Sequence, residues 1–231
     1  MNRVDFGIGI YTAPEAARMV GMQAKTLRRW LLGYDHLTKG KTQHEEPLWH
    51  PQYEPDEEGL LLGFRDLVEA RIINALRAKH IGLPTIRTCM TRAREIVGDD
   101  RPFSTEQFKT DGKTIFLQIT EGLDEPQLID LRRSQGVFNR VVAPSLADLD
   151  FGPDGAERWW LLHGKRTIVA DPARAFGQPI IAAHGITTAR VAQAVEAEGS
   201  VERVAKLYEL KPRLIRDALY YESLAGQRKA A

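Results

Sequence analysis

The chain has little cysteine, almost no net charge and no long apolar run. Cys89 is its one cysteine among 231 residues and has no second cysteine for an internal disulfide, which favours the cytoplasm. No segment approaches the roughly 18 consecutive apolar residues that cross a bilayer, and the first thirty residues lack the apolar core of a secretory signal. The net charge of +1 provides no overall field toward nucleic acid or membrane, so such a function would need local clusters of charge.

The composition is that of an ordinary globular protein with room for two compact domains. Hydrophobic residues make up 43% of the chain and charged residues 27%, which excludes wholesale disorder. Basic residues outnumber acidic ones five to two in residues 1–33 and seven to four in residues 60–99, whereas acidic residues lead seven to two in residues 34–59. This pattern predicts a basic helical pair, an acidic proline-rich connector and a second basic helical pair.

The first predicted helix begins after Thr12 and ends at Gly21. Thr12 suits the N-cap, and Glu15 three residues later completes a capping box. Pro14 stands near the start, where its missing N–H costs no hydrogen bond. Gly21 suits the left-handed position that ends a helix.

A second short helix is predicted over residues 24–32, ended by Gly33 in the same left-handed conformation. Its apolar residues stand three and four residues apart and form one stripe: Leu27, Trp30 and Leu31. Its basic residues lie about 200° around the helix from that stripe: Lys25, Arg28 and Arg29. Two short helices with a basic outer face on the second predict a helix-turn-helix, and a generic helical hairpin is the alternative.

The candidate DNA-binding residues are Thr12, Lys25, Thr26, Arg28, Arg29, Lys39 and Lys41. We expect Arg28 and Arg29 to read or clamp the major groove, while Lys25 and Thr26 hold the register. Lys39-Gly-Lys41 indicates the tip of a β-hairpin wing, with two lysines placed near flanking phosphates. No catalytic residue, metal or cofactor is expected, because no nucleophile–base pair, complete dinucleotide fingerprint or metal-ligand spacing occurs.

The stretch from Tyr11 to Trp30 resembles the opening of MerR-like winged-helix domains, with a Glu-Ala-Ala helix followed by a Thr-Leu-Arg-Arg-Trp recognition helix. A later helix that opens with Phe64-Arg-Asp-Leu and a turn reading Gly82-Leu-Pro-Thr-Ile-Arg resemble the second half of such domains. The resemblance implies a MerR-like winged helix-turn-helix over residues 1–99. The chain departs from MerR regulators because it does not continue into their long dimerising coiled coil.

Residues 100–166 are predicted to form a small β-rich platform. Asp111-Gly112 between β-branched flanks predicts a hairpin over residues 108–119. The further elements expected here are a short helix over 125–134 and strands over 137–142 and 158–162. A structural platform or a dimer surface is the simplest role for this antiparallel sheet.

Residues 167–231 are predicted to form a three-helix, homeodomain-like unit. The elements expected in it are a buried strand over 176–181 and helices over 188–198, 201–208 and 212–224. Residues 168–224 resemble a family of once-uncharacterised domains in antitoxins of bacterial type II toxin–antitoxin pairs. The matching elements are Asp171-Pro172, Gly177-Gln-Pro-Ile-Ile181, Gly185-Ile-Thr187, the Val204-Ala-x-x-Tyr208 helix and Ile215-Arg-Asp-Ala-Leu-Tyr-Tyr221.

The predicted fold class is α+β and mainly helical, with a winged head, a central antiparallel sheet and a C-terminal helical unit. Joined, the two resemblances imply a VapB-type antitoxin, a non-enzymatic protein that represses its own operon and neutralises a PIN-like ribonuclease toxin. A homodimer is expected because DNA half-sites lie about 34–36 Å apart. The alternative is a ligand-sensing MerR-like regulator with a pocket and no toxin. The sequence leaves open the toxin-binding surface and whether the C-terminal helices bind DNA or only dimerise.

Overall fold

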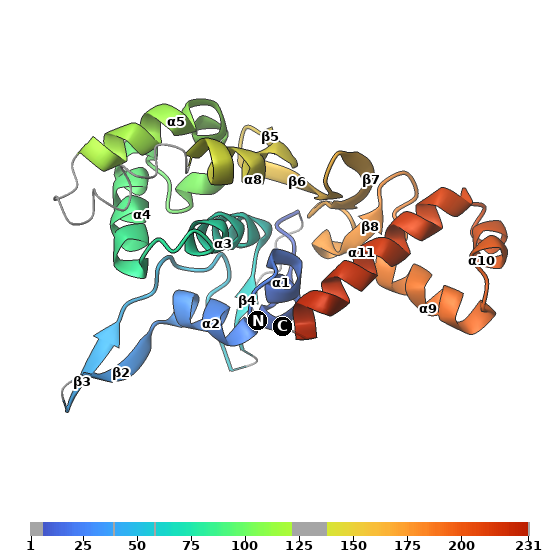
Figure 1. The fold of residues 1–231 in the computed structure, drawn as a ribbon, viewed down its shortest axis with the longest axis horizontal. Coiled ribbons are helices and arrows are strands. Elements are labelled where there is room, and N and C mark those ends of the chain that lie inside the picture. The colour runs from blue at the N-terminus through green and yellow to red at the C-terminus, as the bar shows by residue number, and fades with distance from the viewer. Residues whose placement is uncertain (1–6, 39, 58, 122–137, 231) are drawn as a thin grey trace.

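The computed structural model describes residues 7–230 except 39, 58 and 122–137 (Figure 1). Helices predominate, and the strands form small antiparallel sheets. The elements of the first half are β1 (Tyr11–Thr12), α1 (Ala13–Val20), α2 (Ala24–Leu32), β2 (Tyr34–Thr38), β3 (Lys41–Glu45), β4 (Leu61–Leu62), α3 (Phe64–Arg77), α4 (Leu83–Val97), the 3-10 helix η1 (Pro102–Ser104) and α5 (Glu106–Glu121).

The second half begins with a π-helical segment and ends in three helices. Its elements are η2 (Phe138–Val142), α8 (Ala143–Ala147), β5 (Leu149–Gly152), β6 (Gly155–Leu162), β7 (Lys165–Ala170), the 3-10 helix η3 (Ala175–Gly177), β8 (Pro179–Ile181), α9 (Thr188–Glu198), α10 (Val201–Leu207) and α11 (Pro212–Ala230). No described helix has both the length and the apolar content that a membrane span requires.

The predicted start and end of α1 are confirmed. The Thr12 side chain accepts from the Glu15 backbone N–H at 3.4 Å, and the Glu15 carboxylate accepts from the Thr12 N–H at 2.8 Å, which is the expected capping box. Gly21 ends the helix in the left-handed conformation, with φ 79° and ψ 49°. Only residues 21–23 then separate α1 from α2, as a helix-turn-helix requires.

The predicted left-handed end of α2 is wrong. Gly33 has φ 69° but ψ −177°, so the chain leaves the helix in an extended direction and enters β2 at once. A Cβ at residue 33 would also overlap the backbone carbonyl oxygen of Glu45 on β3. Glycine is needed here both for its positive φ and for the close approach of the neighbouring strand.

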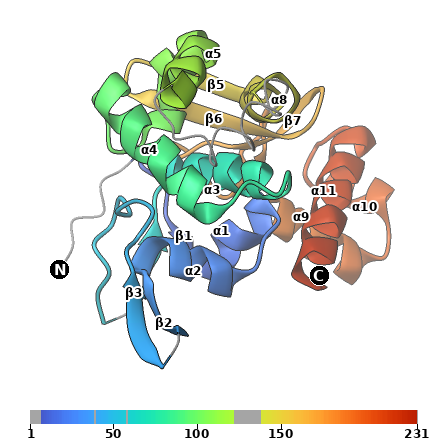
Figure 2. The same ribbon diagram turned by 60° about the vertical axis from the view of Figure 1, so that its left-hand side comes forward.

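The β-hairpin wing expected at Lys39-Gly-Lys41 is confirmed. β2 and β3 pair antiparallel over five residues each, from Tyr34 opposite Glu45 to Thr38 opposite Lys41. Figure 2 shows this hairpin projecting from the body beside α2. Lys39 lies outside the described residues. The hairpin therefore follows directly on the second helix of the N-terminal pair.

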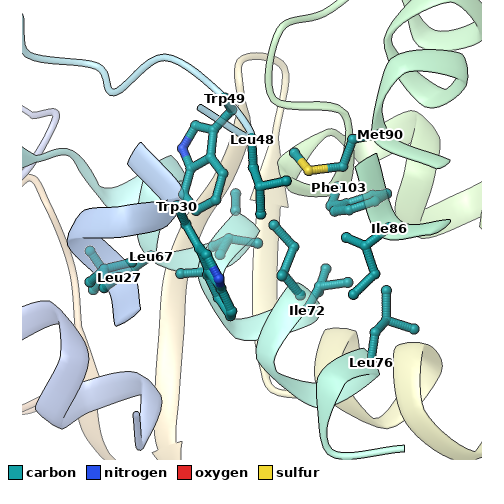
Figure 3. Close-up of a cluster of buried hydrophobic side chains, with 14 of the residues drawn as sticks. Leu27, Trp30, Leu48, Trp49, Leu67, Ile72, Leu76, Ile86, Met90 and Phe103 are labelled. Carbon is teal, nitrogen blue, oxygen red and sulfur yellow. The ribbon is translucent and has the colours of Figure 1, made fainter. Parts of the chain in front are cut away.

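A large hydrophobic core joins the N-terminal helices to the helices that follow them (Figure 3). Leu27 and Trp30 of α2 are buried in the same core as residues of α3, α4 and η1. The labelled members are Leu27, Trp30, Leu48, Trp49, Leu67, Ile72, Leu76, Ile86, Met90 and Phe103. Burying these side chains fixes α2 against α3 and leaves its opposite face outside.

The predicted hairpin over residues 108–119 is wrong, because this stretch is helix α5. Phe108, Ile115 and Ile119 follow helical spacing and are 1–3% exposed in the large core. Their burial outweighs the turn tendency of Asp111-Gly112, and Gly112 lies buried within the helix. The short helix expected over 125–134 lies outside the described residues.

The strand predicted over 137–142 is also wrong where the structure describes it. Residues 138–142 form the π-helical segment η2, which leads into α8. The adjacent Val141 and Val142 are both buried, whereas consecutive strand residues point to opposite faces. The strand predicted over 158–162 is confirmed as part of β6.

A four-stranded antiparallel sheet in the order β5-β6-β7-β8 links the middle of the chain to the C-terminal helices. It continues across residue 166, the expected limit between the second and third domains, and these domain limits stay predictions. The strand expected over 176–181 is confirmed over Pro179–Ile181 only, since Phe176 lies in η3. Helices α9, α10 and α11 match their predicted positions, and α11 extends to Ala230. Their apolar faces share a second core with Ile168 and Ile181 of the sheet.

The segment before α1 binds the two cores together. The Tyr11 hydroxyl donates to the Gly177 carbonyl oxygen at 2.9 Å, and both residues are buried. The Ile10 N–H donates to the Phe176 carbonyl oxygen at 3.0 Å. On the other side, the Phe64 N–H donates to the Ile8 carbonyl oxygen at 2.8 Å. Residues 8–11 thus lie between α3 and the loop that precedes β8.

Candidate nucleic-acid interface

Helix α2 has one buried face and one cationic face. Leu27 is 0% exposed, Trp30 4% and Leu31 2%. Lys25, Arg28 and Arg29 are exposed, and Thr26 is half-buried. The cations share a surface because they lie three and four residues apart on the helix. Such a helix can present several donors together to the phosphates and base edges of a major groove.

The three cations of α2 have different surroundings. The Arg29 guanidinium lies over the Tyr34 ring, 4.7 Å from its centroid, at the start of β2. This cation–π contact restricts the side chain and connects the cationic face to the hairpin. Lys25 and Arg28 make no hydrogen bond or ion pair with other described residues, so their polar heads are available to a partner.

The hairpin is basic near its tip and acidic at its base. Lys41 is exposed where β3 begins. At the base, His44 Nδ1 lies 2.7 Å from the Asp35 carboxylate. The hydrogen bond to Asp35 raises the pKa of His44 above its ordinary value, with a further contribution from the charge of Glu46. An anionic backbone is therefore favoured at the tip and opposed near Asp35 and Glu46.

Thr12 is the N-cap of α1. Its hydroxyl is 2.7 Å from the Glu15 carboxylate, in addition to its capping bond. The side chain is exposed, but its hydrogen bonds are made within the capping box. The structure thus gives Thr12 a direct part in starting α1.

Asp66 is a buried carboxylate that the sequence pattern did not single out. It accepts from Trp49 Nε1 at 3.0 Å, from the Gln52 N–H at 2.8 Å and from the Gly63 N–H at 2.9 Å. Arg101 Nε donates to it at 2.9 Å. These bonds hold the acidic connector, residues 34–59, against α3. Helix α3 packs in the same core as α2. The sequence signal is its position three residues after Gly63, the N-cap of α3.

The basic residues of α4 hold the acidic connector from the other side. Arg87 donates to the Glu46 and Pro47 carbonyl oxygens at 2.7 and 2.8 Å, and Arg94 donates to the Leu48 carbonyl oxygen at 2.5 Å. Burial lowers the pKa of Arg94 from its usual value. Some of the basic residues of the second helical pair therefore bind the acidic connector of the same chain and not an outside partner.

Within the described ranges, no group of three or more histidine, cysteine, aspartate or glutamate side chains could hold a metal ion. Cys89 is buried on α4, and burial raises the pKa of its thiol to about 12. A thiol with such a pKa stays protonated near neutral pH.

Comparison with known proteins places a helix-turn-helix domain at this site. Residues 9–90 match a family described as "Putative DNA-binding HTH domain", and residues 168–221 match one described as "Protein of unknown function (DUF433)". The first match contains α1, α2, the hairpin, α3 and part of α4. The second contains the second half of β7, all of β8 to α10, and the first half of α11.

Two comparisons cover nearly the whole chain. A Mycobacterium tuberculosis protein named "Putative antitoxin VapB45" is 27% identical over 225 residues, which are 93% of this chain and 94% of that protein. A crystal structure of Rv2018 from Mycobacterium tuberculosis has a TM-score of 0.74 and 26% identity, and covers 94% of this chain and 99% of that one. The chain thus combines a DNA-binding type of helix-turn-helix domain with a DUF433 domain, and resembles an antitoxin over its length.

Proposed function

We propose that this protein is a DNA-binding antitoxin that represses its own operon and neutralises a PIN-like ribonuclease toxin. The observation that carries the DNA-binding part is the division of α2 into a buried face and an exposed face with Lys25, Arg28 and Arg29. The adjoining hairpin carries the exposed Lys41, which supports a second contact with DNA. This arrangement is a MerR-like winged helix-turn-helix in which α2 enters the major groove.

In this proposal the candidate residues have separate tasks. Arg28 contacts a base edge or clamps the groove, and Arg29 does so from its position over the Tyr34 ring. Lys25 and Thr26 set the register of α2 through phosphate contacts. Lys41 and Lys39 contact flanking phosphates. Thr12 orients α1 at the edge of the same surface.

The test measures affinity of the full chain for the DNA upstream of its own gene. Arg28→Ala is expected to cost about 1–3 kcal/mol if the guanidinium contacts a base. Lys113→Ala on α5 is the control, because Lys113 is an exposed cation without a partner among the described residues. Equal affinity of Arg28→Ala, Arg29→Ala and the control, with unchanged melting temperature, would sink the assignment of α2 as the recognition helix.

The toxin part of the proposal is supported by the likeness to the Mycobacterium tuberculosis antitoxin. It is tested by tagging the protein at its native locus with the neighbouring gene intact and purifying it. A nuclease-like partner in stoichiometric amount, inactive in the complex and active when released, is the expected result. Recovery of the chain alone, still bound to its promoter, would contradict it.

A second function, that of a ligand-sensing regulator, is favoured by one observation. A cavity of about 570 Å³ lies between the N-terminal segment, the start of α3, β6 and residues 171–173. Arg65 and Asp171 are among its lining residues, so a small polar ligand would suit it. Under this function, a small-molecule extract of the source cells changes DNA affinity and no toxin gene is needed. Under the antitoxin function, DNA affinity responds to the toxin instead.

A further inference from the structure

Helices α10 and α11 repeat the arrangement of α1 and α2 at the other end of the chain. Four residues, 208–211, join the two helices. The turn passes through Glu209 in the left-handed conformation, with φ 54°, and then buries Leu210, whose N–H donates to the Ala205 carbonyl oxygen at 2.7 Å. Helix α9 packs against both. Two helices joined in this way, with a third across them, form a helix-turn-helix.

The inner face of α11 is fixed by apolar and polar contacts. Ile215 and Ala218 are both 0% exposed in the second core. The buried Asp217 carboxylate accepts from Lys165 Nζ of β7 at 2.7 Å. The Thr188 hydroxyl of α9 is hydrogen-bonded to the Glu222 carboxylate at 2.5 Å. These contacts fix which side of α11 faces outward.

The outer face of α11 carries two arginines and a tyrosine in one stripe. Arg213, Arg216 and Tyr220 are exposed and stand three and four residues apart, on the side opposite Ile215 and Ala218. Tyr220 is 55% exposed, although an aromatic side chain of this size is usually more covered.

The arginines of this stripe are available to a partner. Arg213 makes no hydrogen bond or ion pair within the described part of the chain. Arg216 is 2.8 Å from the Glu202 carboxylate, but both side chains are more than 60% exposed. An ion pair so exposed contributes little to stability, and its arginine can exchange partners at small cost.

The charge of this region favours a polyanion. Residues 200–216 contain five basic and two acidic side chains, in a protein of net charge +1. The basic residues are Arg203, Lys206, Lys211, Arg213 and Arg216. A helix whose exposed face is cationic fits the major groove of duplex DNA, which is about 12 Å wide. Figure 1 shows α9, α10 and the start of α11 on the far side of the molecule from the β2–β3 hairpin, while the end of α11 lies beside α1.

We propose that α10 and α11 form a second DNA-binding helix-turn-helix, with α11 as its recognition helix. Arg213 and Arg216 contact phosphates or base edges, and Tyr220 packs against the sugar–phosphate backbone. One chain therefore binds DNA through both of its ends. This site does not depend on α2, because the two helices belong to different cores.

The test uses the full chain and two probes, a 40-base-pair duplex of random sequence and a duplex from upstream of its own gene. Fluorescence anisotropy is measured over a series of salt concentrations. Lys25, Arg28 and Arg29 are first changed together to alanine, so that α2 no longer contributes its cations. Arg213→Ala with Arg216→Ala is then compared, in this background and in the unchanged chain, with the control pair Lys113→Ala and Arg140→Ala. The control pair removes the same charge from exposed positions on α5 and η2.

The expected result is residual, salt-dependent binding after α2 is neutralised. The α11 pair then lowers affinity about tenfold or more and reduces the log–log salt slope by about 2, since each phosphate contact contributes about 0.9. The control pair changes the DNA affinity and the salt slope far less. Melting temperatures verify that the buried face of α11 still folds.

Other outcomes separate this site from α2. Loss of binding in the α11 pair with no effect of the α2 changes would support this site and contradict the proposed role of α2. Complete loss after the α2 changes alone, or equal effects of the α11 and control pairs, would overturn this inference. So would loss of a co-purifying protein partner in the α11 pair while DNA binding stays unchanged.

A second measurement locates the helix on DNA directly. Ser223→Cys extends the outer stripe by one turn and can carry a tethered iron–EDTA group, while the native Cys89 is 3% exposed and escapes labelling. Cleavage confined to a few nucleotides of the upstream duplex is expected. Uniform or absent cleavage by a labelled protein that binds the duplex would contradict the placement of α11.

Discussion

At the residue scale, the buried carboxylate Asp66 holds the connector against α3, which shares a core with α2. Asp66→Ala leaves the Arg101 guanidinium and the Trp49 N–H without their acceptor. Removing one partner of a buried charge pair costs about 3–5 kcal/mol, and we expect a loss of that size in the free energy of unfolding by urea. Asp111→Ala, at an exposed position of α5, is the control. Equal stability of the two variants would show that water replaces the carboxylate.

Glu69 predicts how stability depends on pH. Burial raises the pKa of Glu69 from its ordinary 4.5 to about 8, although its carboxylate accepts from the Ser104 N–H at 2.9 Å. Between these two values the folded protein keeps a proton that the unfolded chain releases. The free energy of unfolding therefore falls as pH rises from 4.5 to 8, by at most about 1.4 kcal/mol per pH unit.

Glu69→Gln removes this dependence while keeping an oxygen that accepts from Ser104. We expect the variant to gain stability relative to the native chain as pH rises toward 8, and to equal it most closely near pH 4.5. Urea unfolding at pH 5, 6, 7 and 8 measures the difference. Parallel pH profiles for the two proteins would contradict the raised pKa.

At the element scale, the hairpin beside α2 depends on Gly33. Gly33→Ala places a Cβ against the Glu45 carbonyl oxygen and strains a positive φ, so β3 must move away from β2. We expect DNA affinity to fall several-fold, with most of the global stability kept. Gly40→Asn is the matched control, because its φ is 74° in open space and asparagine tolerates that conformation. Equal DNA affinity of both variants would remove the hairpin from the interface.

Local signals predicted the helices better than the strands. The Thr12–Glu15 capping box and the Leu27–Trp30–Leu31 stripe each involve neighbours within four residues, and both are confirmed. Asp111-Gly112 is an equally local turn signal, yet Phe108 and its partners fill a core built from distant segments. Tertiary packing therefore determines that residues 108–119 form a helix. The helices that cover this stretch lie elsewhere in the chain, so its own sequence pattern could not reveal them.

At the scale of the whole molecule, the two cores are joined through Tyr11 and Gly177. A Cβ at Gly177 would overlap the Tyr11 hydroxyl, and φ is 84° there. Gly177→Ala should therefore destabilise the protein by about 2 kcal/mol or more through overpacking and strain, whereas Tyr11→Phe loses one hydrogen bond worth about 1 kcal/mol. Thermal unfolding measures both. If Gly177→Ala were the more stable of the two variants, the loop before β8 would be able to move and make room for the added Cβ.

This joint could not be predicted from the sequence. Tyr11 and Gly177 are 166 residues apart, and Arg101, which donates to Asp66, lies 35 residues from it. Periodicity and capping report on neighbours within a turn or two of helix. They predicted the exposed cations of α2, because exposure on a helix follows from its apolar stripe.

The assembly on DNA is the last prediction at this scale. Recognition helices of a symmetric dimer reach half-sites about 34–36 Å apart, and a single copy of α2 reaches only one. We expect the free protein to have about twice the 26.0 kDa mass of one chain by light scattering, and its footprint to show two related half-sites. If α11 also binds, the footprint extends beyond the half-sites and shortens when Arg213 and Arg216 are changed to alanine. A monomer that protects one uninterrupted site would contradict the dimer. In that case the two helices that contact DNA would be α2 and α11 of the same chain.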